Sequence, residues 1–548
     1  MKVRSPWFFA SLGLSALAAV VAFGGAYGAR LSASPSSGLP DADPGVSAGE
    51  GLFVDGSRSD TLEADSVARG RTTGALPPSI QALRAQVDGI LDQGRYARAT
   101  WGVVAVSLDR GDTLLARNAD LPMLPASNLK LVTSAAALHR LGPDYRYSTW
   151  LVTDGVIQDG VLIGDLALYG TGDPGFSDRY HPSSEAPLEA MVSQLVEAGI
   201  HEIRGRVYGD GTLFSGDLLA EGWEPTDLNE WFTAPSGALA YNENVVAVRI
   251  SPGAPGEPPR IVTVPPHVGL IVANEARTVR GRARRPLWLL RDDPEHPIRA
   301  VGELSSTGRD VWREMTVRDP ALAGAHALTH VLRRAGIVVR GFPASVAGAD
   351  ESGVTGPRVW SGRHAPRVLA TFQSPPLRDY LRAVNQRSHN LYADLILRTL
   401  GHLEGDGSFP GGGAAVERFL VETVGVPAEQ VTVMDGSGLS GLNRISPGAL
   451  VQVLAFMTTT SCWEDLWETL PEAGSRALFR RMIRTPASGN LRAKTGTMDR
   501  VSGLTGMVTT ASGERVAFSI LGNELPSETG AKRLEDRIGA LLAAWERQ

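Results

Sequence analysis

Apolar residues recur at regular spacing over most of the chain beyond about residue 77. Four of them lie three or four positions apart and predict an amphipathic helix: Ile80, Leu83, Val87 and Ile90. Two apolar runs, 102–108 and 113–117, lie on either side of a polar turn and predict a β-hairpin. A second helix is expected between Pro125 and Gly142-Pro143, because proline suits a helix entry and Gly-Pro suits an exit.

The last third of the chain shows the same kinds of pattern. Helices are predicted from Leu377, over 391–400 and over 447–457. A hairpin over 503–510 and 516–521 precedes a final amphipathic helix. The apolar face of that helix carries four residues: Leu534, Ile538, Leu541 and Trp545. These elements favour an α+β class in which an antiparallel sheet is flanked by helices.

The middle of the chain has a different sequence pattern, which predicts short strands joined by turns. Strands are predicted over 161–166, 205–210, 245–250 and 269–272. We interpret this stretch as one or two mainly β accessory domains. The predicted organisation is therefore an interrupted domain: a first part at 77–144, an insert at 145–363 and a second part at 364–548.

The N-terminus predicts export. Lys2 and Arg4 precede an uncharged, largely apolar run that ends at Ala29. We expect residues 1–29 to be a signal peptide or, if uncleaved, a membrane anchor. In either case the rest of the chain faces the periplasm or the outer face of the cytoplasmic membrane. Residues 30–76 are rich in Ser, Gly and Pro and predict a flexible linker.

Composition further limits the classes of function that the chain can have. A formal net charge of −6 argues against a nucleic-acid-binding protein. Cys462 is the only cysteine, so no internal disulfide is possible, and its apolar neighbours predict a buried, inert thiol. Five arginines between positions 277 and 285 are interpreted as a solvated strand face, with a contact to anionic wall polymer or lipid headgroups as the alternative. His326 and His330 are expected to be structural.

A candidate nucleophile and base lie one helical turn apart at Ser127 and Lys130. Residues three apart share a helical face, so the hydroxyl and the amine can meet. A serine hydroxyl becomes a good nucleophile when a neighbouring base, such as a desolvated lysine, takes its proton. The pattern S-x-x-K is common by chance, and its plain alternative is a helix-capping serine followed by a surface lysine.

Two later stretches change this interpretation. Ser388-His389-Asn390 and Lys494-Thr495-Gly496 complete an ordered trio: S-x-x-K, S-x-N and K-T-G. That trio is the signature of penicillin-binding and class A β-lactamase acyl transferases. We expect Lys130 to be neutral because the like charge of Lys494 lowers its pKa. Ser388 is expected to pass the proton to the leaving amine, and Asn390 to orient Lys130 and the substrate amide.

The remaining predicted roles concern substrate binding. The hydroxyls of Thr495 and Thr497, with the positive field of Lys494, suit a free carboxylate at the substrate's C-terminus. The backbone N–H groups of Ser127 and Thr497 are expected to form an oxyanion hole. Taken singly, Ser388 has a plain alternative as a helix cap and Lys494 as a surface lysine; their joint occurrence favours a site.

Several further stretches resemble one family. Beside the three motifs, they include 169–174, 222–223, 241–244, 374–377, 435–440 and 489–493. The chain resembles the D-alanyl-D-alanine carboxypeptidase/endopeptidases, the class C low-molecular-mass penicillin-binding proteins. The long insert between the first two motifs separates it from β-lactamases.

The resemblance implies a penicillin-binding transpeptidase fold and hydrolysis of peptidoglycan stem peptides or cross-links through an acyl-enzyme. It implies Ser127 as nucleophile, Lys130 as base, acylation of Ser127 by β-lactams, and no cofactor or metal. It also implies that Asp227 and Phe232 contact the substrate. His389 stands where related proteins often have Asp or Asn.

Two other functions compete with this one. The first is a serine β-lactamase or esterase of the same fold, which would turn over β-lactams promptly. The second is a non-catalytic wall-binding protein, against which the intact trio argues. The partners expected from the sequence are a peptidoglycan peptide and β-lactams, with no nucleic acid and with a membrane only through an N-terminal anchor.

Overall fold

A computed structural model describes residues 76–291, 297–346, 348–354, 366–478 and 480–547. The predicted signal or anchor at 1–29 and the linker at 30–76 lie outside these residues, apart from Leu76. Within the described ranges, no helix combines the length and apolar character needed to cross a bilayer.

An antiparallel sheet of five strands joins the two ends of the described chain, in the order β2-β1-β24-β23-β22. Its strands are β1 Thr100–Ser107, β2 Thr113–Arg117, β22 Arg492–Met498, β23 Val501–Thr509 and β24 Arg515–Asn523. The early hairpin thus pairs with the late strands through β1 and β24. The predicted α+β arrangement is confirmed.

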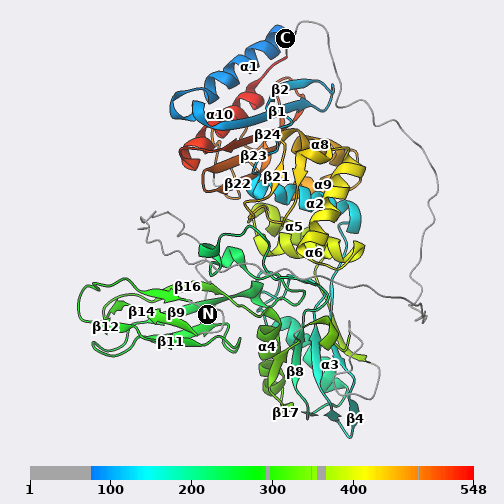
Figure 1. The fold of residues 1–548 in the computed structure, drawn as a ribbon, viewed down its shortest axis with the longest axis vertical. Coiled ribbons are helices and arrows are strands. Elements are labelled where there is room, and N and C mark those ends of the chain that lie inside the picture. The colour runs from blue at the N-terminus through cyan, green and yellow to red at the C-terminus, as the bar shows by residue number, and fades with distance from the viewer. Residues whose placement is uncertain (1–75, 292–296, 347, 355–365, 479, 548) are drawn as a thin grey trace, which may run out of the picture. The chain divides into compact units, whose positions relative to one another are not determined.

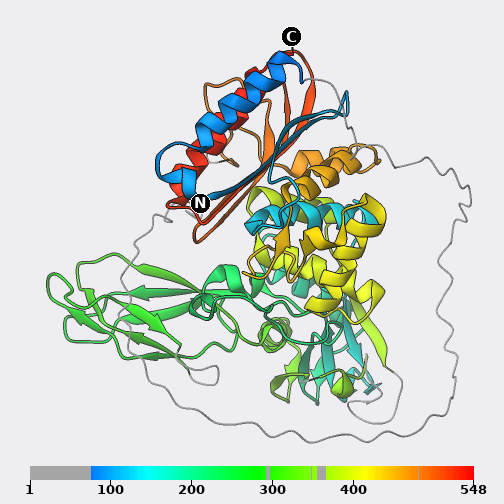
Figure 2. The same ribbon diagram turned by 45° about the horizontal axis from the view of Figure 1, so that its top comes forward.

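Helices cover both faces of this sheet. On one face lie α1 Pro78–Leu91 and α10 Glu528–Ala544, as the blue and red helices show (Figures 1 and 2). The four predicted apolar positions of α1 are all at most 7% exposed. Trp545 lies just after α10, yet it is buried, and its Nε1 donates to the Ser79 carbonyl at 3.3 Å. The apolar spacing of both helices therefore predicted the right face.

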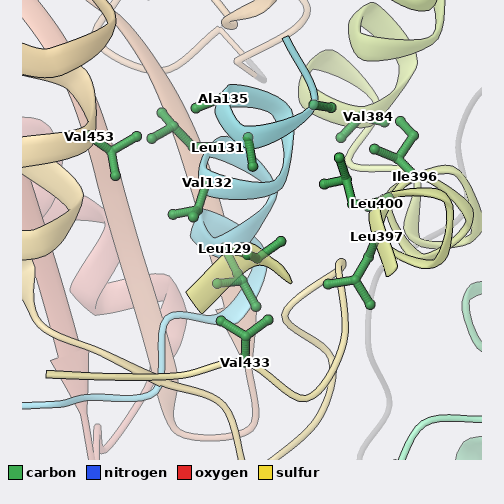
Figure 3. Close-up of a cluster of buried hydrophobic side chains, with 14 of the residues drawn as sticks. Leu129, Leu131, Val132, Ala135, Val384, Ile396, Leu397, Leu400, Val433 and Val453 are labelled. Atoms are coloured by element: carbon green, nitrogen blue, oxygen red, sulfur yellow. The ribbon is translucent and has the colours of Figure 1, made fainter. Parts of the chain in front are cut away.

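The other face holds a helical layer around α2 Leu129–Leu141. All ten residues of α2 from Leu129 to Leu138 are buried, as expected for a helix that neighbouring helices surround. Figure 3 shows its side chains among those of α6 and α8. The surrounding elements are α5 Leu377–Gln386, α6 Asn390–Glu404, α7 Phe409–Arg418, a π-helix at Phe419–Val424, α8 Pro447–Met457, α9 Trp463–Thr469, β20 Val431–Thr432 and β21 Arg444–Ile445.

The strands between residues 148 and 373 pair only with one another in the described sheets. Two mixed sheets have the orders β18-β8-β6-β3-β19 and β17-β7-β5-β4, with α3 Ala186–Glu197 and α4 Pro320–Arg334 beside them. Their strands are β3 Ser148–Thr153, β4 Val156–Gln158, β5 Val161–Ile163, β6 Leu166–Tyr169, β7 Glu202–Ile203, β8 Val207–Asp210, β17 Val338–Val339, β18 Pro343–Ser345 and β19 Arg367–Gln373. The single strand predicted at 161–166 was wrong, because the chain turns at Gly164-Asp165, where the Asp165 carboxylate accepts from the Arg206 N–H.

A second group of strands has its own small apolar core, made by Val248, Ile250, Ile298, Leu304 and Met315. The strands form the sheets β10-β9-β16 and β11-β14-β13 and the pair β12-β15. Their bounds are β9 Val245–Ser251, β10 Arg260–Val264, β11 Val272–Asn274, β12 Arg277–Val279, β13 Trp288–Leu290, β14 Ile298–Val301, β15 Glu303–Ser305 and β16 Val311–Thr316.

This part of the structure differs from the sequence-based prediction in two strands, and the environment of Cys462 differs as well. The strand expected at 269–272 begins only at Val272. Of the five arginines expected on one strand face, only Arg277 lies in a strand, and Arg285 instead pairs with Glu303 at 3.0 Å. Cys462 is half-buried rather than buried, with its Sγ 3.6 Å from the Leu138 carbonyl.

Arg398 of α6 ties the helical layer to the loops of the insert. Its side chain is fully buried. It donates to the carbonyls of Ser215 at 2.6 Å, Ser236 at 2.5 Å, Asp217 at 3.0 Å and Gly407 at 2.8 Å. Burial lowers the pKa of Arg398 to about 10, so it stays charged at neutral pH.

We expect Arg398→Met to lower the free energy of unfolding by about 3 kcal/mol or more, because it leaves several buried carbonyls without a donor. Arg382→Met is the matched control, since Arg382 is 49% exposed and pairs with Glu468 at the surface; its cost should stay below about 1 kcal/mol. Urea unfolding midpoints measure both. Equal midpoints for the two variants would contradict the anchoring role of Arg398.

Candidate active site

Ser127 lies in a 3-10 turn, Ala126–Asn128, that leads directly into α2. The turn leaves the serine half-buried, whereas Lys130, in the first turn of α2, is fully buried. The Lys130 Nζ lies 3.0 Å from the Ser127 Oγ. The contact predicted from the three-residue spacing is present, and the plain alternative of a surface lysine is wrong.

Two more oxygens complete the surroundings of the Lys130 nitrogen. The Asn390 Oδ1 lies at 2.7 Å and the Ser437 carbonyl at 2.6 Å. A neutral amine has two N–H groups and one lone pair. If the N–H groups donate to Asn390 and Ser437, which can only accept at these atoms, the lone pair is left facing the Ser127 hydroxyl. The geometry therefore suits proton transfer from Ser127 to Lys130.

The second and third motifs meet beside this pair. Ser388 lies between α5 and α6, and Lys494 lies on β22. The Lys494 Nζ donates to the Ser388 Oγ at 3.0 Å and to the Thr495 carbonyl at 2.8 Å. Since Asn390 contacts Lys130, the second motif touches both the first motif and the third.

Two glycines permit this close packing. A Cβ on Gly496 would lie 2.5 Å from the Asn128 Nδ2 and 2.7 Å from the Pro125 carbonyl. A Cβ on Gly438, whose φ is +78°, would lie 2.0 Å from the Ala126 carbonyl. Glycine thus lets β22 and the 435–438 loop approach the Ser127 turn, and the loop brings the Ser437 carbonyl to Lys130.

Buried carboxylates fix that loop. Asp435 accepts from the N–H groups of Gly438 and Ser440, both at 2.7 Å, and from the Trp223 Nε1 at 2.9 Å. Asp394, one turn after Asn390 on α6, accepts from the Gly436 N–H at 2.9 Å. Neither aspartate was assigned a role from the sequence. The i, i+4 spacing from Asn390 was a signal that pointed to Asp394.

Burial controls the protonation of both lysines. It lowers the pKa of Lys130 to about 8, although the charges of Asp394 and Asp435 act in the opposite direction. Burial, reinforced by the charge of Lys130, holds the pKa of Lys494 well below its usual range. The sequence predicted that the charge of Lys494 lowers the pKa of Lys130. That cause was wrong, because desolvation of Lys130 is the main reason for the lowered pKa.

The other predicted residues lie around this group. Thr495 is half-buried and Thr497 is exposed, both on β22. Phe232 contributes its carbonyl, which accepts from the Asn390 Nδ2 at 2.8 Å. The Asp227 carboxylate contacts Thr226 at 3.4 Å, and within the described residues it makes no hydrogen bond to a motif side chain.

Comparison with known proteins decides the family. The D-Ala-D-Ala carboxypeptidase 3 (S13) family matches residues 83–545. The chain belongs to this family. Its relatives include the D-alanyl-D-alanine carboxypeptidase of Actinomadura sp. strain R39, which is 30% identical over 500 residues and 88% of each chain. The D-alanyl-D-alanine carboxypeptidase DacB of Haemophilus influenzae is 26% identical over 426 residues, which are 76% of this chain and 84% of DacB.

A solved structure supports the same assignment. Penicillin binding protein 4 (dacB) from Haemophilus influenzae superposes with a TM-score of 0.70 at 25% identity, over 84% of this chain and 99% of that one. The predicted family and fold class are therefore confirmed. The protein is a serine-type D-Ala-D-Ala carboxypeptidase of the penicillin-binding group, and thus a hydrolase.

The pKa of Lys130 leads to a prediction about pH. Protonated Lys130 has no lone pair, so the rate of Ser127 acylation should rise with pH up to about 8 and then level off. Stopped-flow acylation by an ester without a free carboxylate measures this, because such a substrate does not depend on the charge of Lys494. A rate that stays constant from about pH 6 to 9 in folded protein would contradict Lys130 as the base.

Proposed function

We propose that this carboxypeptidase cleaves peptidoglycan stem peptides through an ester on Ser127, with Lys130 as the base. The chief support is the position of the Lys130 Nζ, 3.0 Å from the Ser127 Oγ and 2.7 Å from the Asn390 Oδ1. A buried amine with its lone pair facing a hydroxyl is the arrangement that activates a serine.

The proposed acylation has two proton transfers. Ser127 attacks the carbonyl of the penultimate D-alanine while Lys130 takes its proton. The backbone N–H groups of Ser127 and Thr497 stabilise the oxyanion, at about 3 kcal/mol per donor. Ser388 then passes a proton to the amine of the departing D-alanine; the contact of Ser388 with Lys494 supports this relay. Water afterwards hydrolyses the ester.

Substrate binding is proposed along β22. This strand ends the order of the central sheet. Its start is covered by Glu472, which bridges to Arg492, and by the Pro471 carbonyl, which accepts from the Ala493 N–H at 2.9 Å. We propose that the part of the edge beyond Ala493 pairs with an extended peptide. Thr495, Thr497 and Lys494 would hold the terminal carboxylate. Gly496 would contribute by lacking a side chain, which lets β22 lie against the Ser127 turn. Asn390, Asp227 and Phe232 are the proposed contacts on the opposite side, and the Asn390–Phe232 hydrogen bond supports the last of them.

The finer aspects of the function are proposals of the same kind. We propose that the enzyme also cuts D-alanyl cross-links and that β-lactams acylate Ser127. Penicillin binding protein 4 of Haemophilus influenzae, of which a complex with a β-lactam is known, shares the fold. We further propose an exported enzyme, in the periplasm or on the outer face of the cytoplasmic membrane, with the apolar run at 1–29 as support.

The domain division is also proposed as predicted, with a catalytic domain at 77–144 and 364–548 and an insert at 145–363. Its support is that the strands from Ser148 to Ser345 pair only with one another and with β19 in the described sheets. Because β19 pairs with β3, the sheet of the insert extends to Gln373, beyond the predicted boundary at 363. The first and last strands of the described chain, in contrast, share one sheet.

Fluorescent penicillin provides the first test. We expect the wild-type protein to be labelled covalently and Ser127→Ala to remain unlabelled, because the ester needs the hydroxyl. Ser134→Ala, on the same helix, is the control that should still be labelled. Gel fluorescence measures the outcome. Labelling of Ser127→Ala would place the nucleophile elsewhere, and an unlabelled wild type would favour a wall-binding protein.

Purified muropeptides provide the second test. We expect mass spectrometry to show loss of terminal D-alanine, or conversion of dimers to monomers, and neither product with Ser127→Ala. Unchanged muropeptides combined with rapid turnover of a β-lactam or an ester would instead support the β-lactamase or esterase alternative.

A further inference from the structure

A strained segment of the insert presents one glutamate to the second motif. Asn242, Glu243 and Asn244 all have positive φ, at 50°, 56° and 55°. The segment is held by side-chain bonds: the Asn244 Oδ1 accepts from the Tyr241 N–H at 3.0 Å, and the Asn244 Nδ2 donates to the Pro235 carbonyl at 2.8 Å. Such a backbone persists only where its surroundings determine it.

The Glu243 carboxylate is enclosed by donors. It accepts from the His389 Nε2 at 3.0 Å, from the Tyr392 hydroxyl at 2.7 Å, and from the Arg179 Nε and Nη2 at 2.7 and 3.0 Å. We call these four residues the Glu243 cluster. Burial opposes ionisation, but His389 and Arg179 outweigh it and hold the pKa of Glu243 well below its usual range.

His389 connects the cluster to the reacting groups, because it lies between Ser388 and Asn390. A carboxylate only accepts, so the His389 Nε2 carries a proton. The His389 Nδ1 is buried and has no hydrogen-bond partner within the described structure. The ring also lies 4.1 Å from the ring of Tyr392. Glu243 is therefore the one hydrogen-bonding group described that orients this imidazole.

The backbone beside His389 needs such a restraint. Ser388 has a φ of +55°, a backbone conformation that is strained for a residue with a side chain. Its hydroxyl contacts Lys494, and Asn390 contacts Lys130, both within 3.0 Å. A small relaxation of this segment would lengthen both contacts at once.

We propose that Glu243 is a positioning residue, which acts through His389 to hold Ser388 and Asn390 in place for the reaction. The insert then contributes to the rate of the chemical step as well as to substrate contacts. This inference rests on the proposed function, since it concerns the same two motif residues.

The central test is Glu243→Gln, which keeps the shape of the side chain but removes its charge. On a peptide ending in D-alanyl-D-alanine, we expect kcat to fall about 10- to 100-fold, with KM changing less than about threefold. The matched control is Glu185→Gln, which removes another glutamate of the insert that pairs with an arginine, Arg334, at 2.7 Å. Its kcat should equal that of the wild type.

A milder variant covers the case in which Glu243→Gln does not fold. Tyr392→Phe removes only one hydrogen bond to Glu243 and keeps the ring, so we expect a kcat loss of about threefold or more at unchanged KM. If Glu243→Gln folds, its combination with His389→Asn should lose no more activity than the worse single variant, because the two residues act through one another.

Two results would overturn the inference: a folded Glu243→Gln with wild-type kcat, whether or not its unfolding midpoint is lowered, or fully additive losses in the double variant. If Glu243→Gln does not fold, wild-type kcat in Tyr392→Phe has the same meaning. Failure of the proposed function would look different, because the wild-type enzyme itself would then leave both the peptide and penicillin unchanged.

Discussion

The candidate active site depends on the burial of one lysine amine, that of Lys130. Transfer of a charged ammonium from water into the protein interior is costly, and this cost lowers the pKa of Lys130 to about 8. The buried aspartates Asp394 and Asp435 limit this fall in pKa, so that Lys130 can lose a proton near neutral pH and can also take one up. A base poised near the working pH is the most effective kind. The helical layer around α2 and the 435–438 loop provide this environment.

Local signals in the sequence predicted the elements well. The helix at 447–457 was found at the predicted bounds, because Ser446 caps it, Pro447 begins it and its apolar spacing is regular. The contact of Ser127 with Lys130 was equally predictable, because a single helical turn brings the two side chains together. The family and fold class could also be predicted, from the three motifs together with the further matching stretches and the long insert between the first two motifs.

Contacts between distant parts of the chain were harder to predict from the sequence. Glu243 and His389 are 146 positions apart, and no periodicity relates them. The cause of the Lys130 pKa shift was misassigned because burial depends on packing that a motif does not reveal. The turn between β5 and β6 was missed because Gly164-Asp165 lies inside an otherwise apolar run. The contact that holds this turn, from the Arg206 N–H to the Asp165 carboxylate, joins residues far apart in the sequence. The roles of the motif residues remain predictions that the proposed experiments address.

The pairing of β1 with β24 has a consequence for how the protein is made. The two strands are more than 400 residues apart, as the contact between Ser107 and Glu514 also shows. Contacts of such long sequence separation form slowly, and an early hairpin exposes an unpaired edge until its partner arrives. During synthesis, β1 must wait for nearly the whole chain to emerge. The nascent protein is therefore at risk of aggregation, and it would benefit from a chaperone or from transport in an unfolded state.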